Sequence, residues 1–414
     1  MTIPYEPGLD HTLDLLKEGY TYIPNRRRRF HSDIFQTRLL GQKVVCIGGK
    51  EAAKVFYDNE KFRRKGAAPR RIQQSLFGKN GVQTMDGEKH THRKALFMDL
   101  MTPEHIKELK EIIAKQWNIG LNDWVDRDQI RLFDEARKIM CRAACNWAGV
   151  PLWAKELDLR TADLSAMIDA FGAVGLRHWK GRVARNRTEG WIRKIIWQVR
   201  GGRLHPNEHT ALYKMAWHRN LDGSLMSTQM AAVELINILR PIVAIARYVT
   251  FGALAMHRFP EQTAKLQKND DSYNQYFVQE VRRYYPFGPF LGARVRNNFE
   301  WNGHAFTKGT LVLLDIYGTN HDQELWNNPY SFSPERFAEW DGNLFDFIPQ
   351  GGGNYNFGHR CAGEWITVEV MKVSLHFLAS HMSYKIPEQN LNFNLVRMPP
   401  IPKSRVVLTN VQEK

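Results

Sequence analysis

The longest apolar pattern in the chain covers Met226–His257 and predicts a helix that is hydrophobic on nearly all sides. A helix of this kind belongs in the middle of a large protein, where every face can be covered. Further helices are predicted at Pro103–Leu121, at Arg131–Trp147 and over the amphipathic run Trp365–Met382. Helical patterns therefore occupy roughly half of the chain.

Short apolar stretches predict small strands between these helices. They lie at Val44–Ile47, Phe299–Phe306, Thr310–Asp315 and Arg405–Leu408. We expect a mainly α fold with small β-sheets, built as a single domain over residues 1–414. Its β-rich portions should fall at approximately 20–50 and 385–414.

Composition supports a globular chain: of 414 residues, 43% are hydrophobic and 12% aromatic. The four cysteines are too few and too scattered for a disulfide framework, which favours a reducing, cytoplasmic setting. The first residues lack the pattern of a secretory signal. No stretch reaches ~18 uninterrupted apolar residues, so no transmembrane segment is predicted. Glu234, Arg240, Pro241 and Arg247 interrupt the best candidate.

The net charge of +15 is compatible with nucleic acid, a membrane surface or anionic substrates as partners. Much of the excess lies in the clusters Arg26–Arg29, Arg63–Lys65 and Arg70–Arg71. No stacking platform or helix-turn-helix pattern accompanies them, so we expect no nucleic-acid binding. For most of these residues a solvated basic surface is the favoured interpretation.

Cys361 stands at the end of a glycine-rich loop, just before the predicted helix that starts near Trp365. A helix N-terminus and the basic neighbours His359 and Arg360 both lower the pKa of a thiol. Glycines allow a flat ligand to approach the backbone. The loop therefore predicts a thiolate held against a planar electrophile, and haem iron is the obvious candidate.

Two further motifs precede this loop: Glu280-x-x-Arg283 and Pro334-Glu335-Arg336-Phe337. Glu and Arg at i, i+3 share a helix face and can pair. In this order and spacing, the three motifs resemble those of the haem-thiolate cytochrome P-450 enzymes, over essentially the whole chain. The resemblance implies haem b between the central helix and the cysteine loop, with Cys361 as the axial iron ligand.

The chain departs from the usual motifs of these enzymes. Asn354, Phe357 and His359 stand where the cysteine loop usually has Phe, Gly and Arg. The acid–threonine pair of the central helix, which delivers protons to bound dioxygen, is replaced by Arg240 and Pro241. Pro241 lacks an N–H and should kink the helix.

A guanidinium in an apolar helix needs an anionic partner. One interpretation of Arg240 is a structural ion pair, for instance with Glu234. The other is that a substrate carboxylate docks on it bidentately. Such a carboxylate could serve as the acid–base group that the helix lacks, with hydrogen peroxide as the oxidant and no obligatory reductase.

These features resemble the bacterial fatty-acid peroxygenases, which carry the Arg-Pro pair found here and a segment like Met85–Lys94. The resemblance implies that five residues hold the haem propionates, although each alone could be a solvated surface residue. They are Arg64, His90, Lys94, Tyr285 and His359. Phe77 and Phe287 should line the substrate end of the pocket, or else be ordinary core aromatics.

Members that favour decarboxylation to alkenes tend to have His at the position of Gln83, so hydroxylation at the α or β carbon is predicted. The prediction is peroxide-driven hydroxylation of long-chain fatty acids with Arg240, Pro241 and Gln83 in catalysis. The alternatives are a reductase- and dioxygen-dependent monooxygenase on another hydrophobic substrate, a non-catalytic fatty-acid-binding haem protein, or a haem-free scaffold.

Overall fold

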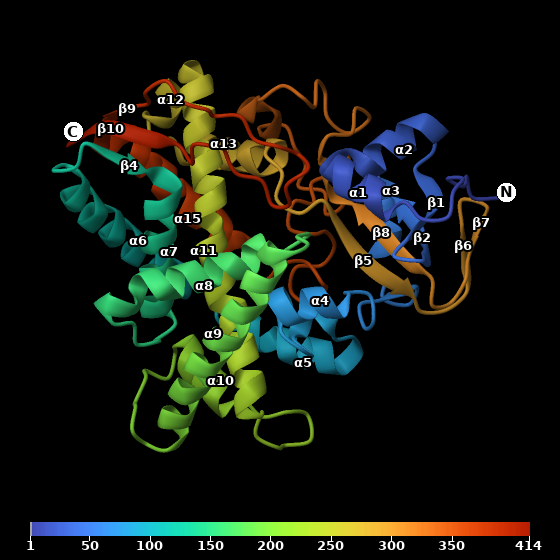
Figure 1. Cartoon of the computed structure of the whole chain (residues 1–414), viewed down its shortest axis with the longest axis horizontal. Coiled ribbons are helices and arrows are strands. Elements are labelled where there is room, and N and C mark those ends of the chain that lie inside the picture. Colours follow the sequence, from blue (N-terminus) through green and yellow to red (C-terminus); the bar gives the residue numbers. More distant parts are fainter. Residues whose placement is uncertain (1) are drawn as a thin grey trace.

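The computed structural model describes residues 2–414 and has a helical part and a smaller sheet part (Figure 1). The helices are α1 Thr12–Glu18, α2 Tyr22–Phe30, α3 Lys50–Phe56, α4 Arg70–Ile72, α5 Gly87–Met98, α6 Pro103–Trp124, α7 Leu132–Trp147, α8 Leu157–Asp169, α9 Leu176–Arg200, α10 Ala211–Trp217, α11 Thr228–Arg258, α12 Pro260–Leu266, α13 Asp271–Tyr284, α14 Ile316–Asn320 and α15 Glu364–His376. Single 3-10 or π turns are η1 Gly19–Thr21, η2 Gln73–Phe77, η3 Val82–Thr84, η4 Ala154–Glu156, η5 Pro334–Phe337 and η6 Phe377–His381.

The strands form three small sheets. They are β1 Ile34–Leu39, β2 Gln42–Ile47, β3 Phe62–Arg63, β4 Gln129–Arg131, β5 Phe290–Val295, β6 Phe299–Trp301, β7 His304–Phe306, β8 Leu311–Asp315, β9 Met382–Lys385 and β10 Val407–Glu413. The largest sheet has the order β1-β2-β8-β5-β3, with only β2 and β8 parallel. It lies near the N-terminus in Figure 1, whereas β4, β10 and β9 lie beside the C-terminus.

Helix α11 is the centre of the helical part and packs against α7, α8, α9, α13 and α15. Almost all of its residues are buried, as the all-round apolar pattern predicted. By length and hydropathy it is the one helix of residues 2–414 that could span a membrane, but 83% of its most apolar window is buried inside the fold. Two of its buried charged residues have ionic partners: Glu234 pairs with Arg93, and Arg247 pairs with Asp169.

Each helix and strand predicted from the sequence has a counterpart in the structure, although further elements such as α8, α9 and β5 were not predicted. Two of the predicted elements differ in form. The run predicted as one helix to Met382 ends earlier, because α15 gives way to η6 and then to β9. The single strand expected at 299–306 is a hairpin, because Asn302 and Gly303 form a turn at φ of +51° and +73°.

Part of the first arginine cluster is buried, contrary to the solvated surface expected for most of the basic residues. Arg26 pairs with Glu6 at 2.9 Å and with Glu18. Arg27 lies 2.9 Å from Asp322. These pairs hold α2 to the segments around it, so part of the basic excess is structural.

His321 makes the protein sensitive to acid. Its ring is buried and donates from Nδ1 to the carbonyl of Tyr317 at 2.9 Å, and burial lowers its pKa to about 3. An unfolded histidine binds a proton below about pH 6.5, whereas the folded one stays neutral. Stability should therefore fall as pH decreases from about 6.5 towards 3, by about 2 kcal/mol at pH 5.

The measurement is the free energy of unfolding in urea at several pH values. In His321→Gln the loss between neutral pH and about pH 5 should be smaller by about the same 2 kcal/mol. Equal slopes for both proteins would show that His321 carries none of the acid sensitivity.

Candidate active site

Cys361 lies in the loop directly before α15. Its backbone N–H donates to the carbonyl of Gln350 at 3.1 Å, and the Gln350 side-chain amide lies 3.7 Å from the sulfur. The same amide donates to Thr367 Oγ1 at 3.0 Å, which fixes its direction. Cys361 is partly buried, whereas Cys46, Cys141 and Cys145 are fully buried. Cys361 is thus the cysteine that a ligand can reach.

The thiol of Cys361 does not have the lowered pKa that the sequence predicted. Helix α15 begins at Glu364, so the thiol lies three residues before its first turn. Burial raises the pKa of Cys361, Glu364 adds to the rise, and Lys94 opposes it. A thiolate at this position therefore depends on a cation that binds the sulfur, because a coordinating metal deprotonates a thiol.

Contacts within the protein require glycine at several positions of the loop. A Cβ on Gly351 would lie 2.7 Å from the Tyr57 hydroxyl, and one on Gly352 would lie 2.7 Å from the Leu344 carbonyl. Gly351 and Gly353 also have φ of +94° and +78°. These glycines thus have a packing role against Tyr57 and Leu344, and their close approach to a flat ligand stays a prediction.

Four predicted cofactor residues come together beside Cys361. The rings of His90 and His359 lie 3.9 Å apart, and Lys94 Nζ donates to the Arg360 carbonyl at 2.5 Å. Arg64 is buried, with its guanidinium 4.3 Å from the centre of the Phe56 ring.

Burial depresses the pKa of all four groups, to about 3 for His90 and about 4 for His359. Asp86 lies 3.7 Å from His359 Nε2, and the other nearby carboxylate, Glu364, is already paired with Arg360 and Arg282. Buried basic groups with so little negative charge nearby fit an anionic ligand such as the two propionates of haem.

Tyr285 does not join this cluster. It is fully buried and stacks on Phe251 of α11 at 4.7 Å, with Phe393 at 5.8 Å. Burial raises the pKa of its phenol. The ring of Tyr285 thus packs among aromatic side chains, its buried hydroxyl has no hydrogen-bond partner within residues 2–414, and its role at a propionate stays a prediction.

Arg240 lies in the middle of α11, which runs on through Pro241 without a break. The residue is 8% exposed, and its buried Nε has no hydrogen-bond partner among residues 2–414. Burial and, to a smaller extent, the neighbouring Arg185 lower the pKa of Arg240 to about 9, and Cys361 opposes the shift. Arg240 and Cys361 are therefore close enough to interact electrostatically.

The structural ion pair considered for Arg240 is absent from the described part of the chain. Glu234 accepts from Arg93 Nη1 at 2.9 Å, from the Val82 N–H at 3.0 Å and from Asn237 Nδ2 at 3.0 Å. Its carboxylate is fully buried within these contacts. The guanidinium of Arg240 is left for another anion.

The remaining predicted residues surround this part of α11. Asn237, one turn before Arg240, donates to the Phe77 carbonyl at 2.9 Å and lies 3.3 Å from Gln83 Oε1. Phe287 stacks at 5.3 Å on Tyr248. Sequence reasoning missed Asn237, although its i, i+3 spacing from Arg240 places both on one helix face.

The Glu280 network connects the Glu280-x-x-Arg283 motif with the Pro334-Glu335-Arg336-Phe337 motif. Glu280 pairs with Arg283 at 2.7 Å and with Arg336 at 3.3 Å, as the motif order predicted. A second network, missed from sequence, runs from Arg282 to Glu364 at 2.6 Å and to Gln350 at 2.8 Å. Arg282 thereby ties α13 to the cysteine loop.

Comparison with known proteins places the chain in a family. Residues 267–404 match the model of the cytochrome P450 family. The structure of cytochrome P450EX alpha (CYP152N1) with myristic acid superposes with a TM-score of 0.97 at 47% identity, covering 100% of this chain and 99% of that one. The chain belongs to the CYP152 family of cytochromes P450.

Two further P450 structures are similar over nearly their whole length. A point variant of cytochrome P450 OleT in complex with arachidonic acid gives a TM-score of 0.97 at 39% identity and covers 100% of this chain and 99% of that one. Cytochrome P450SP alpha (CYP152B1) in complex with (R)-ibuprofen gives 0.95 at 45%, covering 98% and 99%. Among curated proteins, cytochrome P450 26A1 of Danio rerio is 21% identical over 91% of this chain and 83% of its own length.

Cytochromes P450 bind haem b through a cysteine thiolate. Cys361 is the one cysteine within the matched residues 267–404. The buried basic side chains Arg64, His90, Lys94 and His359 fit the propionates of that group, and Cys361 fits its iron. In this P450 the cysteine loop therefore contributes the iron ligand Cys361 to the site, and α11 contributes Arg240.

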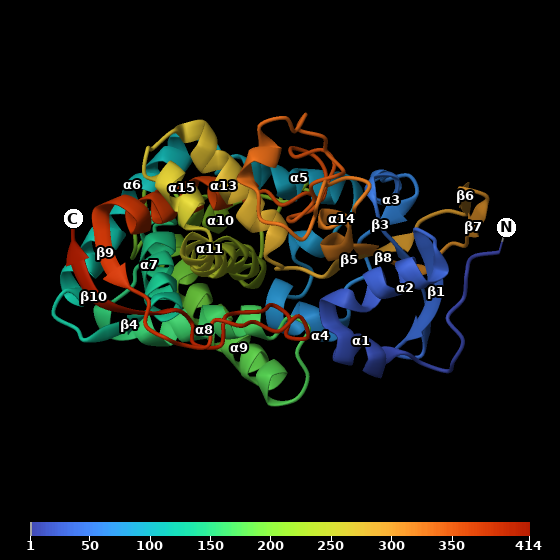
Figure 2. The ribbon, with the colours of Figure 1, turned by 90° about the horizontal axis from the view of Figure 1, so that it is seen from above.

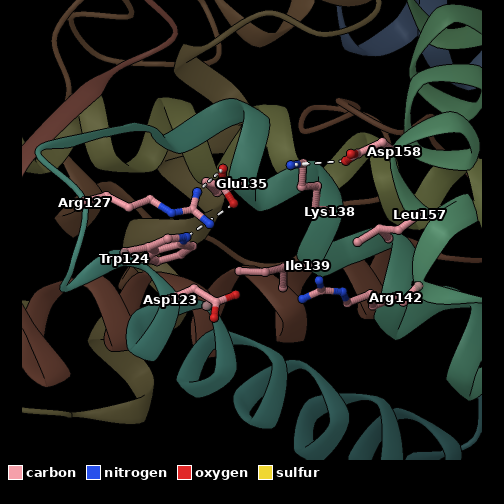
Figure 3. A pocket seen from close by; sticks show the side chains of 11 residues that line it. Asp123, Trp124, Arg127, Glu135, Lys138, Ile139, Arg142, Leu157 and Asp158 are labelled. Carbon is pink, nitrogen blue, oxygen red and sulfur yellow. Dashed lines mark hydrogen bonds and ion pairs between the residues drawn. The ribbon is translucent and has the colours of Figure 1, made fainter.

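A separate polar cavity of about 180 Å³ lies between α6, α7 and α8 (Figure 3). Four of its charged side chains bind one another: Arg127 pairs with Glu135, and Lys138 with Asp158. None of the predicted site residues lines it. The cavity is not part of the haem site.

Proposed function

We propose that this P450 uses hydrogen peroxide to hydroxylate long-chain fatty acids at the α or β carbon, with terminal alkenes as a minor product. The observation that carries the proposal is the guanidinium of Arg240, which is buried in an apolar helix and has no anionic partner within residues 2–414. A fatty acid is an apolar chain with a single carboxylate. The carboxylate therefore matches the charge of Arg240, and the chain matches the apolar surroundings of that residue.

The reaction depends on how the chain's own residues hold the acid. Arg240 binds the carboxylate in a bidentate way and fixes the first carbons of the substrate relative to the cofactor. Pro241 lacks the N–H that would bond the Asn237 carbonyl, so one hydrogen bond of α11 is absent next to Arg240. Haem held by Cys361, Arg64, His90, Lys94 and His359 supplies the oxidising chemistry.

The bound carboxylate is proposed to move the protons, because the side chains around it are poor acids. Gln83 is an amide without a titratable proton, and Phe77 and Phe287 are apolar. Without an imidazole at position 83, we infer that hydroxylation outweighs decarboxylation. Two similar structures contain myristic acid and arachidonic acid, which supports the substrate class.

We also propose that the chain works as one domain in the cytoplasm and without an obligatory reductase. The central position of α11 supports a single domain, since the helix packs against elements from both halves of the sequence. A reductase-dependent monooxygenase and a non-catalytic fatty-acid-binding protein are the competing functions.

The deciding experiment is incubation of the purified haem-loaded protein with myristic acid and ¹⁸O-labelled hydrogen peroxide, without a reductase. Mass spectrometry should find α- and β-hydroxy acids that carry the label. Turnover only with a reductase, and unaffected by catalase, would favour the monooxygenase. Saturable binding of myristic acid with no product under either condition would favour the binding protein.

A further inference from the structure

Four large apolar side chains are exposed within ten residues at the start of α9. Val174 is 54% exposed, Leu176 82%, Trp179 57% and Val183 56%. Leu176, Trp179 and Val183 follow the i, i+3, i+7 spacing of one helix face. Single exposed apolar residues are normal on a protein, but a contiguous group indicates an interaction surface. We call these four residues the apolar stripe.

The apolar stripe has only positive charge around it in sequence. Residues 171–188 contain five arginines or lysines and no aspartate or glutamate. Arg185 and Arg187 are paired with Glu189 and Asp163, but Arg177, Lys180 and Arg182 make no ion pair within residues 2–414. The Arg182 guanidinium lies 5.2 Å from the centre of the Trp179 ring. Unpaired cations therefore flank the exposed tryptophan.

Other segments extend this surface. Arg71 of α4 donates to the Ala173 carbonyl and so fixes α4 beside the stripe. Figure 2 shows α1, α4 and the start of α9 along the same lower edge of the molecule. On and beside α1, Leu9 is 94% exposed and Leu13 69%. The edge thus combines several apolar contacts with basic side chains, over more than one element.

The stripe lies outside the elements that line the haem site. Helix α9 packs against η2, and Arg185 donates to the Leu76 carbonyl at 2.9 Å. Phe77, the next residue, contacts the Asn237 amide through its carbonyl. A surface bound at the start of α9 is therefore one layer of protein away from the region of Arg240.

We propose that this edge docks on an anionic lipid bilayer, with the apolar stripe in the interface and Arg177, Lys180 and Arg182 on the lipid phosphates. Exposed Trp and Leu beside Lys and Arg are the composition of an interfacial helix. Each basic side chain near an anionic membrane contributes attraction that a neutral membrane does not supply. The inference concerns a surface and does not depend on the proposed reaction.

Vesicle sedimentation tests the proposal with the full-length haem-loaded protein. Binding to phosphatidylcholine vesicles that contain phosphatidylglycerol should exceed binding to pure phosphatidylcholine by about tenfold or more. The double variants Leu176→Ser/Trp179→Ser and Arg177→Gln/Lys180→Gln should each lower the affinity for the anionic vesicles by about tenfold. The matched control is Trp153→Ser, because Trp153 is 68% exposed but lies outside this edge, before α8.

Three results would overturn the proposal: no binding to anionic vesicles, unchanged binding of both double variants, or an equal loss in the control. A dimer in sedimentation velocity that Trp179→Ser dissociates would assign the stripe to a second copy of the chain instead. Peroxide turnover of myristic acid in vesicle-free solution should be the same in all variants. Failure of docking is therefore distinguishable from failure of the proposed function.

Discussion

Replacement of Arg240 by leucine should reduce peroxide-driven turnover of myristic acid by on the order of a hundredfold or more. The guanidinium is the proposed partner of the substrate carboxylate, and charge-assisted hydrogen bonds contribute about 1.5–3 kcal/mol each. The same variant should fold at least as well as the wild type, because a buried cation without an ion pair is replaced by an apolar side chain. Product analysis and thermal unfolding measure the two effects.

Arg93→Leu is the matched control. Arg93 is also buried, but it pairs with Glu234 at 2.9 Å, so its removal leaves a buried carboxylate without its cation. That loss should cost about 3–5 kcal/mol of stability. If Arg240 were structural, the two variants would be destabilised alike. Full turnover by Arg240→Leu would remove the basis of the proposed function.

The long apolar helix and the cysteine loop are two parts of the molecule that the sequence predicted well. The pattern at Met226–His257 differs from α11 by one or two residues at each end, because an all-round apolar run has few alternatives to burial. The cysteine loop was located by its motif. Both signals are local, since they depend on residues that are close in sequence.

Contacts between distant segments could not be predicted in the same way. The Arg282–Glu364 pair joins residues far apart in sequence, and nothing in either segment specifies the other. The resemblance grouped Tyr285 with four cofactor residues, and the stacking of its ring on Phe251 could not be foreseen from either segment. Residue type alone could not distinguish these two environments.

The partner of Arg240 could be predicted only in part from the sequence. The sequence identified an isolated cation in an apolar helix and left two partners open. The structure removed one of them, because Glu234 is saturated by Arg93, Asn237 and the Val82 N–H. The buried guanidinium of Arg240 still requires an anion, and a bound ligand can provide it.

Replacement of Arg283 by methionine should destabilise the protein by about 3–5 kcal/mol. Arg283 and Glu280 are fully buried and bonded at 2.7 Å and 2.8 Å. Arg283 also donates to the carbonyls of Asn320 and Pro329, which belong to segments after β8. Without it, Glu280 would keep only Arg336 at 3.3 Å and the Ser333 N–H at 2.9 Å.

The measurement is urea unfolding of haem-loaded protein, with Lys265→Met as the matched control. Lys265 pairs with Glu335, but both side chains are 45% exposed, so its loss should cost at most about 1 kcal/mol. In Arg283→Met, the further change Glu280→Gln should recover part of the loss, because it removes the unpaired charge. A loss below about 1 kcal/mol for Arg283→Met would mean that solvent compensates Glu280.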